Sequence, residues 1–358
     1  MVRDGHEYGN SHDSPSPCGR GLGGGVATGT APSPQPPPAR GGGVNGGELP
    51  PETVHLSFET GPYRMAMGLI TVPQSDWIEL DARYREEMAE RRRLLAERHD
   101  DVFGVLPQAE DASCEALQRL VAYLTTQFPD RFRLDGSTLI NRLTCETWNL
   151  AAPPCHPLEL AGRLVQEDLC IIQSDAGVPR FTAAILCFPS RWRLHEKLGR
   201  PLTVVHGPVP FYADRLASPV NRFMAKVKPG HIASRLNWSV LDDPAMYQPS
   251  GKWREAANTA ITPENAGDTL YLRVERQTLT RLPRTDAILF GIRVHSYPLA
   301  AAITKPAVAA QLAEAVRALP EETRHYKSLK AFGPALLAWL DARAALPQAF
   351  GTFGGASP

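Results

Sequence analysis

The chain has 358 residues, with 38 lysines and arginines against 38 aspartates and glutamates, and its sequence pI is about 7.1. Proteins that bulk charge holds on nucleic acid or on an anionic membrane carry an excess of basic residues, so this balance argues against both partners. Hydrophobic residues make up 43% of the chain, an ordinary globular proportion, and no stretch has the roughly 18 uncharged apolar residues of a membrane-spanning helix.

Residues 1–52 differ sharply in composition from the rest of the chain. Glycine and proline dominate, and Tyr8 is the one aromatic residue. Such a segment buries too little apolar surface to offset the entropy lost on ordering, so we predict a disordered tail. It lacks the basic start and apolar run of a signal peptide, so a cytoplasmic location is expected. Residues 53–346 are predicted to form a single domain, and residues 347–358 a flexible C-terminus.

The first half of this domain has helical periodicity. Apolar residues recur at intervals of three and four over residues 76–95, 111–124 and 157–169, with charged residues between them. Three helices are therefore predicted, beginning near Asp76, near Asp111 and after Pro157.

The second half contains short alternating or β-branched runs instead. Strands are predicted at residues 181–188, 234–240, 269–275 and 287–294, and two closing helices at residues 306–319 and 334–345. The connections are too varied for a regular βαβ repeat. The predicted fold class is therefore α+β, with an antiparallel sheet and helices on one face.

Signatures of common catalytic folds are missing from the sequence. No Gly-x-Gly-x-x-Gly lies between a strand and a helix, and there is no P-loop, His-Glu-x-x-His or Gly-x-Ser-x-Gly sequence. The six cysteines include no Cys-x-x-Cys pair, which argues against a zinc ribbon or an iron–sulfur cluster on this chain. A flavin or nicotinamide, if used, is expected on a partner chain.

His206 has an unusual local setting. It follows Val204 and Val205 and precedes the turn sequence Gly207-Pro208-Val209-Pro210. The apolar neighbours and the two prolines favour an imidazole held in one orientation away from water. Haem iron takes a neutral imidazole of this kind. The alternative is a core histidine that is hydrogen-bonded to a backbone carbonyl.

Two polar runs accompany this histidine. In a strand, Arg235, Asn237 and Ser239 share one face, which either meets a ligand carboxylate or faces solvent. Residues 273–283 are rich in arginine, the side chain best suited to bidentate carboxylate recognition. Haem has two propionates, so clustered arginines near a buried histidine form a coherent set, although ordinary Arg–Glu pairs on a sheet explain the same residues.

The chain resembles the haem-dependent oxidative N-demethylase family from about Leu56 to Leu329. The resemblance depends on several long runs that occur in matching order and spacing. These are residues 62–69, 76–81, 164–170, 187–192 with 196–199, 206–210, 235–239, and 276–279 with 282–283.

The resemblance implies a fold and a reaction. The family's type member is the haem subunit of an enzyme that oxidises dimethylamine to methylamine and formaldehyde, using O2 and electrons from NADPH. It implies a PAS-like antiparallel sheet with flanking helices that encloses a haem b pocket. Electrons are implied to arrive through a reductase subunit with a flavin (FMN) and an iron–sulfur cluster, and formaldehyde to pass to a tetrahydrofolate-binding subunit.

The resemblance also implies roles for particular residues. His206 is the expected iron ligand, because the competing His195, His231 and His295 lie outside the matching letters. Expected cofactor contacts are Arg222, Arg235, Asn237 and Arg276, and the carboxylates expected to meet a cationic amine are Glu196 and Glu275. Two alternatives remain: a haem-binding PAS-like sensor or carrier without turnover, and an interaction protein with an empty pocket.

Overall fold

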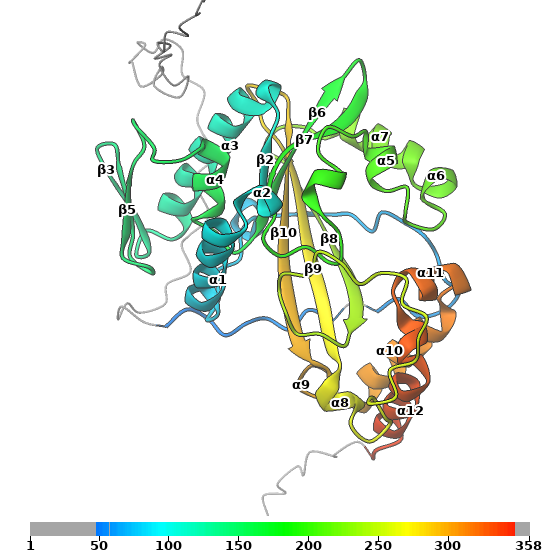
Figure 1. Cartoon of the computed structure of the whole chain (residues 1–358). Coiled ribbons are helices and arrows are strands. Elements are labelled where there is room, and N and C mark those ends of the chain that lie inside the picture. Colours follow the sequence, from blue (N-terminus) through cyan, green and yellow to red (C-terminus); the bar gives the residue numbers. More distant parts are fainter. Residues whose placement is uncertain (1–47, 57, 348–358) are drawn as a thin grey trace, which may run out of the picture.

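The computed structural model describes residues 48–56 and 58–347. Most of the predicted N-terminal tail, and all of the predicted flexible C-terminus except Pro347, lie outside these residues. The described residues form a seven-stranded antiparallel sheet and a three-stranded one, with helices around them (Figure 1). The larger sheet has the order β1 (Ile70–Val72), β8 (Ile232–Leu241), β9 (Tyr271–Arg281), β10 (Ile288–Pro298), β6 (Asp168–Asp175), β7 (Val178–Ile185), β2 (Phe103–Val105).

The smaller sheet is a meander of β3 (Phe132–Asp135), β4 (Thr138–Asn141) and β5 (Glu146–Asn149). The helices are α1 (Tyr84–Glu97), α2 (His99–Val102), α3 (Glu110–Gln127), α4 (Pro157–Gly162), α5 (Leu202–Val205), α6 (Tyr212–Arg215), α7 (Ala217–Lys226), α8 (Ala266–Thr269), α9 (Leu299–Ala302), α10 (Pro306–Ala318), α11 (Glu321–Tyr326) and α12 (Gly333–Ala344). Mixed helices and antiparallel strands confirm the predicted α+β class.

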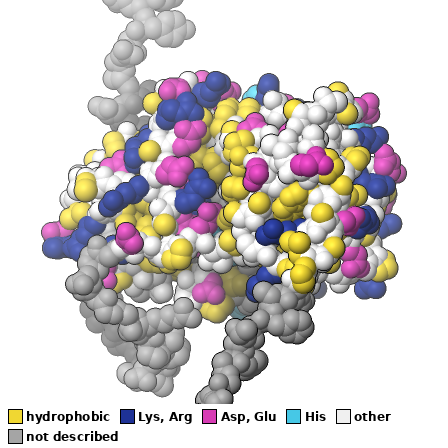
Figure 2. All heavy atoms as spheres, turned by 90° about the horizontal axis from the view of Figure 1, so that it is seen from below, with side chains coloured by type: hydrophobic (Ala, Val, Ile, Leu, Met, Phe, Trp, Pro, Cys, Tyr) yellow, Lys and Arg dark blue, Asp and Glu magenta, His cyan; other side chains and the backbone are white. Residues whose placement is uncertain are grey.

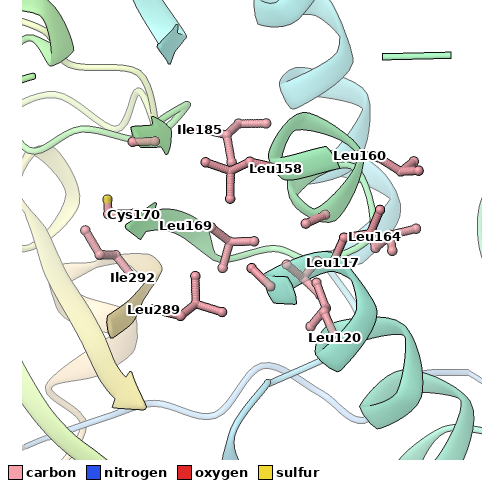
Figure 3. Packing of buried hydrophobic residues seen from close by; sticks show 14 of the residues in the cluster. Leu117, Leu120, Leu158, Leu160, Leu164, Leu169, Cys170, Ile185, Leu289 and Ile292 are labelled. Carbon is pink, nitrogen blue, oxygen red and sulfur yellow. The ribbon is translucent and has the colours of Figure 1, made fainter. Parts of the chain in front are cut away.

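Apolar packing joins α1, α3 and α4 to one face of the larger sheet. Figure 3 shows Leu117 and Leu120 of α3 and Leu158 of α4 in one cluster with Leu169 of β6 and Leu289 of β10. All five side chains are buried. The helical stripe of α3 and the period-two alternation of β10 therefore meet in a single core.

Helices cover both faces of the sheet, so the prediction of helices on one face was wrong. In Figure 1, α5, α6 and α7 lie across the sheet from α1, α3 and α4. Leu202 of α5 and Phe223 of α7 pack with Ile172, Leu279 and Ile288 of the strands. α5 and α6 have four residues each, too few turns for helical periodicity to reveal them, whereas α7 has an amphipathic pattern over ten residues that our sequence analysis missed.

Two predicted helices differ from the structure. The helix expected from Asp76 begins at Tyr84, after a 3-10 turn at Gln74–Asp76. The helix expected over residues 157–169 ends at Gly162, and β6 begins at Asp168. A continuous run of buried apolar residues fits a helix or a fully buried strand equally well. From Asp168 onward the chain forms the strand. The other predicted helices and strands are confirmed, with boundaries shifted by a few residues.

The molecular surface agrees with the neutral net charge. Acidic and basic side chains are interspersed among apolar ones over the face shown in Figure 2. Among the described residues, the helices are all too short or too polar to cross a bilayer.

Fully buried ion pairs connect α1 to the sheet. Arg91 of α1 and Asp168 of β6 approach to 3.0 Å with no exposed surface on either side chain. Asp168 also accepts the backbone N–H groups of Cys187 and Phe188, each at 2.8 Å. Arg91 donates to the Gln166 carbonyl at 3.0 Å. This pair therefore holds α1, the start of β6 and the segment after β7 together.

Replacing Arg91 by methionine should destabilise the fold strongly, because Asp168 would remain buried without its countercharge. The expected loss is about 3–5 kcal/mol in the free energy of unfolding, measured by urea denaturation. Arg93 on the same helix pairs with Glu90 at 2.7 Å but is exposed, so Arg93→Met should leave the unfolding midpoint nearly unchanged. Equal losses in the two variants would contradict a special role for the buried pair.

Candidate functional site

The neighbouring strands β8 and β9 present polar side chains on the sheet face beneath α5–α7. The register opposes Arg235 to Gln277 and Asn237 to Glu275. Opposed residues of antiparallel strands point to the same side, so all four side chains share one face. Asn237 Nδ2 donates to Glu275 Oε2 at 3.1 Å, and Gln277 Nε2 donates to the same oxygen at 2.8 Å. The predicted polar stripe of β8 thus finds its partner in β9.

Glu275 is the carboxylate at the centre of this face. Burial by itself raises the pKa of the Glu275 carboxyl. Hydrogen bonds from Ser190, Asn237 and Gln277 and the nearby charge of Arg273 outweigh burial, so the pKa lies below its usual range. Glu275 is therefore ionised at neutral pH and remains fixed in orientation.

Arg273 holds the loops that border this face. Its side chain is 1% exposed. It donates to the carbonyls of Phe188 at 3.0 Å, Ala245 at 3.1 Å and Met246 at 2.9 Å, and to Ser190 Oγ at 3.0 Å. One guanidinium from β9 therefore fixes two chain segments that are far apart in the sequence.

His206 follows α5 and is half-buried. Its Nδ1 lies 2.8 Å from the Leu202 carbonyl oxygen, so Nδ1–H donates and Nε2 keeps its lone pair. The imidazole stacks on the Tyr212 ring, with centroids 4.5 Å apart and planes inclined by 13°. Burial, together with the positive charges of Lys197 and Arg235, lowers the pKa of His206 to about 4. The ring is thus neutral at pH 7 and is held in one orientation.

A cavity of about 370 Å³ lies beside His206 and Lys197. Its walls come from residues 191–197, from Val205, Pro208 and Val209 beside His206, from residues 249–253, and from Tyr326. The size falls within the usual range for small-molecule pockets. Glu196 lies on the wall, but its side chain is exposed.

Lysines that the sequence did not single out lie around Glu275 and His206. Burial lowers the pKa of Lys197 and of Lys327 to about 8, although Glu275 opposes the shift in both. Lys327 Nζ donates to the Trp238 carbonyl at 2.6 Å, and Lys252 Nζ donates to the Tyr326 hydroxyl at 3.0 Å. Lys197 stands in the Glu196–Gly199 motif, a signal that could have identified it, whereas Lys327 follows α11 without any sequence pattern.

Two expected cofactor residues do not join this group. Arg276 lies on the opposite face of β9, where Nε is 3.1 Å from Glu79 Oε1. Successive residues of a strand alternate between faces, so Glu275 and Arg276 cannot line the same pocket. Arg222 is exposed on α7 and donates to Ser218 Oγ at 2.6 Å. The structure does bring His206, Arg235, Asn237 and Glu275 to one face.

A comparison with protein families places these residues in a known context. The family model described as "Haem-dependent oxidative N-demethylase, alpha subunit-like" matches residues 68–337. The match spans three quarters of the chain and includes the whole sheet, the cavity walls, His206 and Glu275. The chain therefore belongs to the haem-dependent oxidative N-demethylase alpha subunit-like family.

Proposed function

We propose that this protein binds haem b in the cavity beside His206, on a PAS-like sheet, and catalyses oxidative N-demethylation of a secondary amine such as dimethylamine. The observation that carries the proposal is the setting of His206. A neutral imidazole with a free Nε2 lies near Lys197, Arg235 and Lys252. Lys197 and Arg235 in turn interact with the ionised Glu275.

The His206 geometry suits a residue that would hold haem iron. A metal ligand needs an unprotonated nitrogen, and the pKa of about 4 keeps Nε2 free of a proton at neutral pH. The hydrogen bond from Nδ1–H to the Leu202 carbonyl selects the required tautomer and raises the basicity of the ring. Stacking on Tyr212 restricts rotation.

The surrounding cations suit the carboxylates of a haem. Lys197, Arg235 and Lys252 all lie close enough to His206 to affect its charge. Within the described part of the chain, Arg235 Nε is buried and has no hydrogen-bond partner. An unpaired buried guanidinium nitrogen is costly, and a propionate oxygen would satisfy it. Arg235 and Lys252 are therefore our candidates for propionate contacts, with Asn237 on the same sheet face as Arg235.

Glu275 is the proposed binding group for the amine. A secondary amine is cationic near neutral pH, and a buried ionised carboxylate binds a cation strongly. The three amides and hydroxyls that donate to Glu275 fix its direction. Glu196 is exposed at the cavity wall, where it can attract the cation on entry.

The reaction consumes one O2, two electrons and two protons per dimethylamine, and gives methylamine, formaldehyde and water. When bound, the haem supplies the O2-dependent oxidation of the N-methyl carbon. In this chain His206 would hold the haem, Glu275 would orient the amine, and the apolar wall of Val205, Pro208 and Val209 would limit water.

The electrons must come from another chain. The description "alpha subunit-like" supports an enzyme of several subunits. We propose a reductase subunit with FMN and an iron–sulfur cluster that draws on NADPH, and a tetrahydrofolate-binding subunit that accepts formaldehyde. We also propose a cytoplasmic location for this multi-subunit enzyme.

Replacing His206 by alanine should remove the proposed iron ligand without harming the fold, because the side chain is only half-buried. We expect the protein, expressed with a haem precursor, to lose the Soret band of the parent and the shift of that band with dithionite and CO. His231 is exposed, and His231→Ala is the matched control. An unchanged spectrum in His206→Ala would overturn the ligand assignment.

Replacing Glu275 by glutamine removes the charge while it keeps the shape. Hydrogen bonds to charged groups contribute about 1.5–3 kcal/mol, so kcat/KM for dimethylamine should fall roughly 10- to 150-fold. The Soret band should persist, which separates amine binding from haem binding. Glu264, exposed before α8, provides the control Glu264→Gln. Glu196→Gln should cost less than Glu275→Gln, because water screens its charge.

The haem spectrum and the amine turnover measurement together test the competing sensor function. A parent protein that binds haem and CO, but does not release formaldehyde from dimethylamine when supplied with electrons, would favour a sensor or carrier. A colourless parent that fails haem titration would contradict both functions.

A further inference from the structure

A second cluster of ionisable side chains lies on the opposite face of the sheet, where residues 52–55 cross β10. His295 of β10 is 1% exposed, and its two ring nitrogens contact two carboxylates. Nδ1 lies 2.9 Å from Glu52 Oε1, and Nε2 lies 3.1 Å from Glu79 Oε2. His55 completes the cluster, with its ring centroid 4.9 Å from that of His295.

The donor atoms of this cluster are spaced as metal ligands are. His55 Nε2 lies 3.3 Å from Glu79 Oε1 and 3.4 Å from Oε2, and His295 Nε2 lies 3.1 Å from Oε2. One ligand atom from each of the three residues lies within 4.8 Å of the other two. Zinc–nitrogen and zinc–oxygen bonds of 2.0–2.2 Å in a tetrahedron place neighbouring ligand atoms about 3.3 Å apart.

Outer contacts orient two of the three residues, His295 and Glu79. Histidines that bind zinc commonly donate their second ring nitrogen to a carboxylate, and Glu52 occupies that position on His295 Nδ1. Arg276 Nε lies 3.1 Å from Glu79 Oε1 and holds that oxygen, which leaves Oε2 directed at His295. Glu79 N–H in turn donates to Glu167 Oε1 at 2.9 Å. The cluster therefore has the second layer of hydrogen bonds that fixes a metal site.

Charge balance also favours a cation here. Arg293 forms ion pairs with Asp81 at 2.6 Å and with Glu87 at 2.7 Å. Arg276 forms an ion pair with Glu79. Within residues 48–56 and 58–347, Glu52 has only the distant Arg83, at 3.9 Å, as a guanidinium partner. A positive charge between Glu52 and Glu79 is supplied either by a proton on His295 or by a metal ion.

We propose that His55, Glu79 and His295 bind one zinc ion, with water in the remaining position, and that this ion fastens the N-terminal segment to β10. Two histidines and one carboxylate form a donor set that zinc accepts. Tyr297 of the same strand adds a second contact to that segment, because its hydroxyl donates to the Thr53 carbonyl at 2.6 Å. The site lies across the sheet from His206 and does not depend on the proposed haem reaction.

Metal titration of the full-length protein tests the proposal. After treatment with a chelator and its removal, Zn2+ is added in a calorimeter, and Co2+ is added in parallel as a spectroscopic probe. We expect one equivalent of Zn2+ to bind, with proton release from His295 and a rise in Tm. The Co2+ form should show the visible d–d bands of a four-coordinate site.

Variants distinguish this site from adventitious binding. His55 comes from a surface segment, so His55→Ala should fold normally and lose at least about tenfold in Zn2+ affinity, and Glu52→Gln should lose roughly 10- to 100-fold. His99 contacts Glu159 at 2.9 Å on another part of the surface, and His99→Ala should bind as the parent does. A parent protein without stoichiometric binding, or unchanged affinity in His55→Ala, would overturn the proposal and leave a proton on His295 as the charge that holds the segment.

Discussion

Side-chain alternation along β9 is the constraint on which both sites depend. Arg273 and Glu275 point to the sheet face that carries Asn237, and Val274 and Arg276 point the other way. A single strand thereby supplies the carboxylate of the candidate haem pocket on one face and the arginine of the His295 cluster on the other. A shift of one residue in register would exchange the two sets and leave each buried charge without its partner.

Buried guanidinium groups keep this arrangement rigid. Arg91, Arg273 and Arg293 are among the largest fully buried side chains, and each is held by carboxylates or by several carbonyls. Burial of an unpaired charge is prohibitive, so these contacts admit one packing of α1, the sheet and the loops around the cavity. The two loops that Arg273 holds begin beside residues that line the cavity.

The candidate pocket combines an uncharged imidazole with charged neighbours. Its apolar wall keeps His206 neutral, and the adjacent Lys197, Arg235 and Lys252 reinforce that effect, because a proton on the ring would be repelled. Lys197 and Arg235 also lower the cost of burying Glu275. The proposed zinc site lies on the opposite face of the sheet and would not touch this pocket.

The sequence by itself determined the α+β class, most of the long helices and the strands β7, β8, β9 and β10, because these depend on local periodicity. It also placed Arg235 and Asn237 on one strand face. Only the tertiary structure decided which distant groups meet them: Glu275 by strand register, Lys327 from the C-terminal region, and Arg276 on the other face. The position of helices α5–α7 across the sheet and the His55–Glu79–His295 cluster likewise arise from packing between segments far apart in the chain, and a local pattern does not encode such packing.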